Sequence, residues 1–86
     1  MSEWESARAA VLSLLARRAE GATICPSEAA RALAAERGSE DWRGEMDAVH
    51  AAVDGLVFEG AVQLSWRREA VAERTGAYRI GRAKGP

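Results

Sequence analysis

Apolar residues recur at helical spacing in three stretches of the chain. The first stretch predicts an amphipathic helix over residues 3–19 that ends near Gly21. The second predicts a helix over residues 26–37, which begins with Pro26 and has a largely alanine face. The third predicts a helix over residues 42–59 with Ser39 as its N-cap. The apolar stripe of this third helix consists of Trp42, Met46, Val49, Val53, Leu56 and Val57.

The apolar period changes after Gly60 from the helical to the strand value. Alternating apolar residues predict a strand over residues 62–66, and a second strand is expected around residues 78–80. The residues between these strands, 67–76, are too many for a tight hairpin, so we expect them to form one long loop that carries arginines.

Three helices followed by a two-stranded β-hairpin predict an α+β, winged helix-turn-helix-like fold, in which the long loop is the wing. The 86 residues are enough for one small core, so we expect a single domain over residues 1–86. Residues 23–25 are expected to be extended, because a proline restricts the residue before it. Residues 81–86 are expected to form a frayed tail.

Composition narrows the class of protein. A domain of this size has little room for a deep enzyme cleft, so we expect a binding domain and no catalytic activity. The single cysteine excludes an internal disulfide, and the N-terminal residues do not follow a signal-peptide pattern. No apolar run approaches the roughly 20 residues that cross a bilayer. We therefore expect a cytoplasmic protein without membrane contact or cofactor.

Charge is distributed unevenly along the chain. Residues 1–60 hold six arginines and eleven acidic residues, a net charge of -5, whereas residues 61–86 hold six basic and two acidic residues, a net charge of +4. Such asymmetry can indicate an anionic partner, although an ordinary solvated hairpin explains it equally well. The arginines expected to contact a phosphate backbone are Arg67, Arg68, Arg74, Arg79 and Arg82.

The predicted third helix does not suit the usual mode of DNA recognition. In helix-turn-helix proteins the second helix of the motif enters the major groove. Here residues 40–59 carry six acidic residues and one arginine, a net charge of -5, which would repel a polyanion. We therefore expect weak, salt-sensitive nucleic-acid binding through the wing, in a transcription-related or other regulatory role, with the third helix turned away.

A second function stays open, namely a protein-protein interaction or homodimerisation module with no nucleic-acid binding. The acidic third helix and the basic hairpin are electrostatically complementary, and complementary surfaces favour association with another protein or between two copies. The same two surfaces can equally satisfy each other within one molecule.

Few residues suggest chemistry. Cys25 precedes Pro26 at the start of a predicted helix, where a thiol can be reactive, but a small buried side chain is the simpler interpretation. His50 lies between Asp47 and Asp54 at helical spacing, and we expect it to be an exposed histidine with local ionic support. The chain has no second histidine or cysteine to complete a zinc site, so we expect no metal.

The chain has T-I-C-P-S-E-A-A-R-A-L at residues 23–33, D-W-R at residues 41–43, A-V at 48 and 49, Leu56, E-G at 59 and 60, and an arginine-rich hairpin. Together these motifs resemble a small bacterial domain-of-unknown-function family, family 3253. The resemblance covers nearly all of the chain. It implies a winged-helix-like fold and no particular activity, ligand or partner. It also leads us to expect proline or glycine in the wing, where this chain has R-R-E-A-V-A-E-R-T.

Overall fold

The first helix is shorter than the sequence predicts. The computed structural model describes residues 3–72, 74 and 76–83, and in it α1 spans Glu3–Ala16. The prediction that this helix reaches residue 19 is wrong, because the N–H groups of Arg17 and Arg18 donate to carbonyl groups only three residues back and tighten the end of the helix. The carbonyl group of Leu15 also accepts a hydrogen bond from the Arg82 guanidinium, which satisfies it without a further helical turn.

The second helix begins where the sequence predicts. α2 spans Pro26–Glu36, with proline in the first turn, where its missing N–H group is not needed. The Glu28 carboxylate accepts the backbone N–H of Cys25 at 2.8 Å, as an acidic residue in a capping box does. The residues T-I-C-P-S-E therefore encode the local start of this helix.

The third helix begins later than predicted, because Ser39 is not its N-cap. The N–H of Ser39 donates to the carbonyl of Ala34 at 2.9 Å, so this residue closes α2 instead. A 3-10 turn, η1 (Arg43–Glu45), follows, and α3 spans Met46–Phe58. The carboxylate of Asp41, two residues before η1, accepts the N–H of Gly44 at 3.2 Å.

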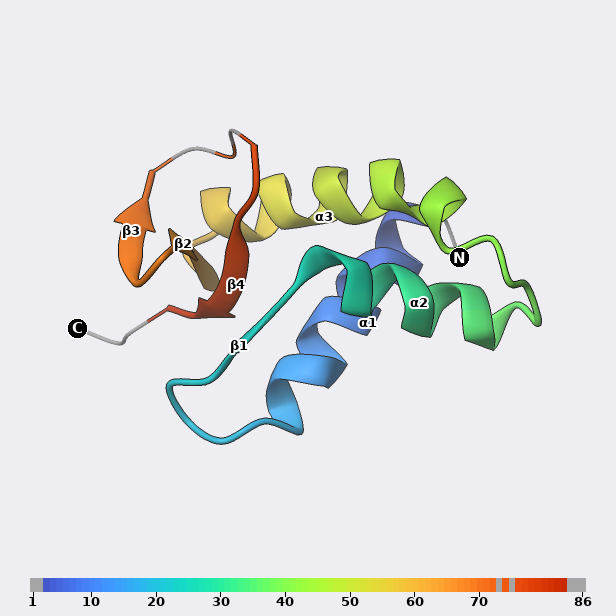
Figure 1. Cartoon of the computed structure of the whole chain (residues 1–86), viewed down its shortest axis with the longest axis horizontal. Coiled ribbons are helices and arrows are strands. Elements are labelled where there is room, and N and C mark those ends of the chain that lie inside the picture. The colour runs from blue at the N-terminus through green and yellow to red at the C-terminus, as the bar shows by residue number, and fades with distance from the viewer. Residues whose placement is uncertain (1–2, 73, 75, 84–86) are drawn as a thin grey trace.

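Within the described residues, four strands form one antiparallel sheet, whereas the sequence predicts two strands. They are β1 (Thr23–Ile24), β2 (Val62–Trp66), β3 (Glu69–Val71) and β4 (Arg79–Arg82), in the spatial order β1-β4-β2-β3 (Figure 1). The prediction of a single long loop over residues 67–76 is wrong, since β2 and β3 form a tight hairpin within that segment. The predicted second strand is β4, and it lies in the interior of the sheet.

The predicted frayed tail over residues 81–86 is wrong at its beginning. Gly81 belongs to β4 and pairs with Thr23 on one side and Gln63 on the other. A side chain at Gly81 would bring its Cβ to 3.2 Å from the Thr23 methyl group, so glycine permits the close approach of β1. Residues 84–86 lie outside the described part of the chain.

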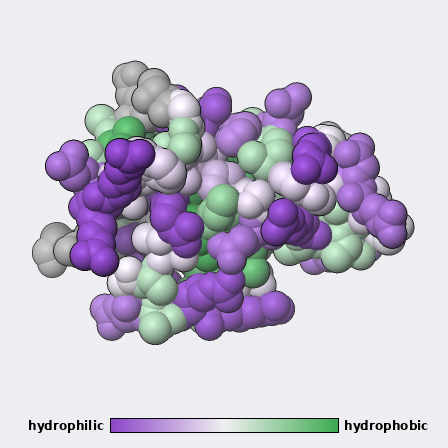
Figure 2. All heavy atoms as spheres, in the orientation of Figure 1, coloured by the Kyte–Doolittle hydropathy of each residue, from purple (hydrophilic) through white to green (hydrophobic). Residues whose placement is uncertain are grey.

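The core lies between the three helices and one face of the sheet (Figure 1). Alternate residues of the strands point into it, as the strand period requires. The largest fully buried side chains are Ile24, Leu33, Leu56, Ile80, Val11, Val49 and Val53. Hydrophilic side chains cover much of the face shown in Figure 2. Of the helices that the structure describes, none has the length and apolar character needed to cross a membrane.

Candidate functional site

Two arginines form the whole turn of the β2–β3 hairpin. The pairing of Trp66 with Glu69 leaves only Arg67 and Arg68 between the strands. Their φ angles are 54° and 72°, and a two-residue turn with two positive φ angles is of type I′. This turn favours Asn-Gly, because most side chains clash with the backbone in the left-handed region. The hairpin therefore places arginine at two positions where asparagine and glycine would be more stable.

Both turn arginines are exposed, and neither forms an ion pair within the described residues. The Arg67 guanidinium carbon lies 5.9 Å from the centroid of the Trp66 ring, at the outer limit of a cation–π contact. Arg68 also lines a surface pocket of about 540 Å³, whose other lining residues include Glu20, Gln63 and Ser65. The guanidinium groups at the hairpin tip can therefore bind an external anion without first breaking an internal salt bridge.

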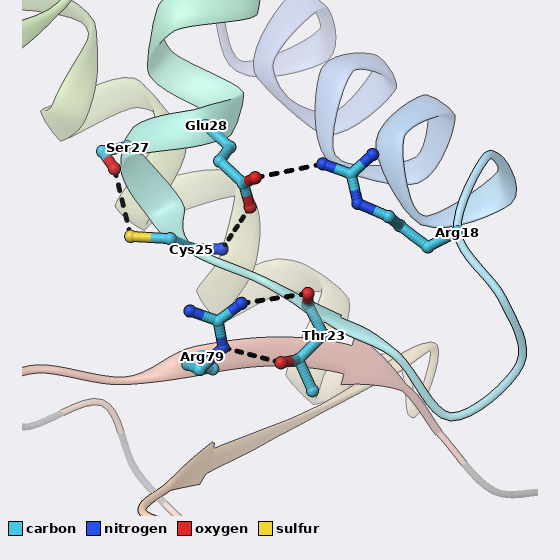
Figure 3. A network of polar contacts seen from close by, with 6 residues as sticks. All are labelled: Arg18, Thr23, Cys25, Ser27, Glu28 and Arg79. Carbon is cyan, nitrogen blue, oxygen red and sulfur yellow. Dashed lines mark hydrogen bonds and ion pairs between the residues drawn. The ribbon is translucent and has the colours of Figure 1, made fainter.

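The other three arginines of the predicted contact surface are bound to the protein itself. Arg74 donates to both carboxylate oxygens of Asp54, at 2.9 and 3.0 Å. Arg79 donates to the hydroxyl and the carbonyl of Thr23, at 2.7 and 3.1 Å (Figure 3). Arg82 donates to a carbonyl at the end of α1. The predicted five arginines thus divide into two at the turn that offer their donors to solvent and three that use donors internally.

The acidic charge of segment 40–59 is partly neutralised by arginines of other segments. Asp54 pairs with Arg74, Glu59 accepts two hydrogen bonds from Arg8 of α1, and Glu45 pairs with Arg37 at 3.2 Å. Hydrogen bonds from these arginines hold the pKa values of Asp54 and Glu59 below their usual range. Three of the six acidic residues in segment 40–59 therefore have an arginine partner, and repulsion of an anion is weaker than the sequence count suggests.

The family comparison matches residues 5–83 to the family described as "Protein of unknown function (DUF3253)". The chain belongs to this family. The matched segment runs from α1 through β4, which confirms the resemblance seen in the sequence. No curated protein matched the chain. Membership of the DUF3253 family assigns no reaction, ligand or partner.

The cysteine of this DUF3253 protein lies in a polar network at the start of α2 (Figure 3). The Cys25 sulfur lies 3.0 Å from the Ser27 hydroxyl, and the Glu28 carboxylate also accepts a hydrogen bond from Arg18 at 3.0 Å. The backbone N–H of Cys25 and the Arg18 guanidinium lower the pKa of Glu28. The thiol is half-buried, so the expectation of a buried side chain is not met. Its reactivity stays a prediction.

A histidine of α3 contacts a tyrosine that directly precedes β4, and the sequence did not suggest this pair. His50 Nδ1 lies 2.6 Å from the Tyr78 hydroxyl. Burial raises the pKa of Tyr78 to about 12, and burial together with the charge of Arg74 lowers the pKa of His50. The half-buried histidine corrects the expectation of an exposed one. Local spacing pointed to Asp47 and Asp54 as its partners, whereas the observed partner is distant in the sequence.

The segment around η1 lies at the opposite end of the DUF3253 protein from the β2–β3 hairpin (Figure 1), and two further arginines contact Trp42 there. The guanidinium carbons of Arg31 and Arg43 lie 4.6 and 4.5 Å from the Trp42 ring centroid. Both arginines are exposed, and their guanidinium groups lie over the Trp42 ring within the distance of a cation–π contact. Within the described residues, no group of three or more histidine, cysteine, aspartate or glutamate side chains could hold a metal ion.

Proposed function

We propose that this DUF3253 protein is a winged-helix-like domain that binds the phosphate backbone of nucleic acid through Arg67 and Arg68. The observation that carries the proposal is the type I′ turn, in which both residues have positive φ angles and exposed side chains without an ion pair in the described chain. Strained non-glycine residues are often retained where their side chains have a function. A guanidinium group suits this role, since it donates two parallel hydrogen bonds to a phosphate.

The order of the elements supports this proposal. The order is a helix, a strand, two helices and then three strands, of which the first two form the hairpin, and β4 lies between β1 and β2. This order is typical of a winged helix, in which the β2–β3 hairpin would form the tip of the wing. Arginines at such a tip can contact the backbone or enter a narrow minor groove.

The exposed side of α3 favours contact through the hairpin over insertion of this helix into the major groove. Asp47 and Phe58 are exposed on α3, and Asp54 holds its arginine partner there. Asp47 has no arginine partner among the described residues, so its carboxylate repels phosphate. The phenyl ring of Phe58 supplies no positive charge. The proposed contact therefore consists of about two phosphates, both reached from the hairpin tip.

Two phosphate contacts give a specific salt dependence. The logarithm of the association constant should fall with the logarithm of salt concentration with a slope of about -1.8 for duplex DNA. Fluorescence anisotropy with a labelled duplex about two helical turns long, measured from about 50 to 200 mM salt, tests this slope. We expect weak binding that is lost in the double variant R67N/R68G.

A charge-matched variant provides the control. R31A/R43A also removes two exposed arginines, but from the opposite end of the molecule. We expect this control to bind the duplex with nearly the slope of the unchanged protein. Equal loss of binding in both double variants would show a response to net charge alone, and loss in R31A/R43A only would place the contact near η1. Either result would overturn the proposal.

A further inference from the structure

Phe58 is the most exposed large hydrophobic residue among those that the structure describes. It is the last residue of α3, and its side chain is 93% exposed, compared with 41% for Trp4, 37% for Leu12 and 43% for Trp66. The neighbouring residue Leu56 is fully buried, so the helix presents its buried side to the core and its phenyl ring to solvent. Neither the core nor the proposed phosphate contact uses this ring.

An apolar groove lies directly beside the ring. Its volume is about 250 Å³, and Val57, Leu64 and Ala72 line it together with Phe58. The paired side chains Asp54 and Arg74 also line it. A protruding phenyl ring, an apolar hollow and one charge of each sign therefore occur on the same small surface.

The edge of the sheet next to this groove is open. β3 is the last strand in the described sheet, so one of its edges has no strand partner there (Figure 1). The turn between Trp66 and Glu69 brings these two residues into a hydrogen-bonded pair. Because hydrogen-bonded and non-hydrogen-bonded pairs alternate, Ala70 directs its N–H and C=O groups away from β2. An open edge of this kind is a template for another strand.

We propose that a second copy of this chain occupies the edge and groove, with the two β3 strands antiparallel and centred on Ala70. Phe58 of each copy then enters the groove of the other. A two-fold axis perpendicular to the sheet would place both α3 helices on the same face of the joined sheet, where the rings can be exchanged.

A second copy fits this surface because the surface is complementary to itself. A two-fold interface uses the same patch on both molecules, so each feature needs its complement within that patch. The ring has the groove, and the N–H of Ala70 has the C=O of Ala70 in the other copy. Arg74 and Asp54 are already paired within each copy, so this pair brings no unpaired charge to the interface. Nucleic acid does not fit, since the lining is mostly apolar and the two charged residues that line the groove, Asp54 and Arg74, neutralise each other.

Sedimentation equilibrium of the whole chain tests the proposal over about 1 µM to 1 mM, a range that covers weak dimers. We expect a monomer-dimer equilibrium whose dissociation constant rises about tenfold or more in F58S, as for a central interface residue. A70P should weaken the dimer similarly, because its N–H group is lost, while an edge strand tolerates proline where that group faces solvent. The control L12S replaces an exposed apolar residue of α1 and should leave the equilibrium unchanged.

Several outcomes would overturn the proposal. They are a monomer over the whole concentration range, an unchanged dissociation constant in F58S, or equal weakening in L12S. Phe58 has almost no buried surface, so F58S keeps the fold and tests the dimer even if A70P disturbs β3. Amide chemical shifts that change with concentration should map to β3 and the last turn of α3. Shifts confined to other elements would show that a different surface mediates association.

Discussion

Replacing the two turn arginines by asparagine and glycine should move stability and binding in opposite directions. The variant R67N/R68G gives the type I′ turn the residues that it favours, and it removes both guanidinium groups from the hairpin tip. Ordinary loss of a contact residue leaves stability unchanged or lowers it. A gain in stability together with a loss of binding would therefore show that the arginines are retained at a cost in folding free energy.

The expected gain follows from the two backbone angles. At φ angles of 54° and 72°, residues with a Cβ are less stable than in the usual regions by roughly 1–2 kcal/mol each. Glycine relieves this strain at position 68, although its freedom in the unfolded chain takes back about 0.5–1 kcal/mol. Asparagine relieves part of the strain at position 67, since it adopts this region more readily than arginine. We expect a net gain of about 1 kcal/mol, because both side chains are exposed and no buried contact is lost.

Urea and thermal unfolding measure this gain directly. A stabilisation of about 1 kcal/mol should raise Tm by about 4–8 °C in a domain of this size, with an unchanged urea m-value. The control R67A/R68A removes the same charges but keeps a Cβ at both positions, so it should lose binding without a gain in stability. An unchanged or lower Tm in R67N/R68G would refute the argument that the turn is strained. Duplex binding that survives in both variants would refute the proposed contact.

Three further predictions concern other elements. Leu56→Ala should lower the free energy of unfolding by about 2–5 kcal/mol, because Leu56 is fully buried. Phe58→Ala, two residues away on the same helix, should change it by less than about 0.5 kcal/mol at low protein concentration. Similar losses for the two variants in urea unfolding would contradict the burial pattern. Asp54→Asn should release Arg74 for a further phosphate contact and steepen the salt slope of duplex binding by about 0.9, and an unchanged slope would count against this. Because burial lowers the pKa of His50 in the folded protein, the unfolded chain binds the imidazole proton more tightly, and stability should fall as pH drops through about 6.5. His50→Gln should flatten that part of the profile of urea midpoint against pH. A profile as steep as before would show that His50 is not the group responsible.

Much of the helical layer could be predicted because its signals are local. The 3.6-residue period placed Val49, Val53 and Leu56 on one side of the third helix, and all three are fully buried. Proline at position 26 marked the start of the second helix correctly. Helix ends were less well predicted. Ser39 could either close the second helix or cap the start of the third, and the sequence did not distinguish these two roles.

The β2–β3 hairpin and the partners of its arginines could not be predicted from local sequence signals. Positive φ angles at two consecutive arginines go against residue preferences, so the sequence suggested one long loop where β3 forms a strand. Arg67 and Arg68 looked no different in the sequence from Arg74, which is held by Asp54. The open edge of β3 depended on the order of strands, which residue periodicity does not contain.

The amino-acid sequence by itself determined the α+β class, the three helices, the family and the basic character of the C-terminal third, because these depend on neighbouring residues and on composition. Tertiary structure decided which arginines remain available, since their partners are far away in the chain: Arg79 binds Thr23 and Arg82 binds Leu15, 56 and 67 residues distant. Folding brings these groups together when the helices and sheet pack around one core. The charges left at the hairpin tip and the ring left on α3 are therefore products of packing.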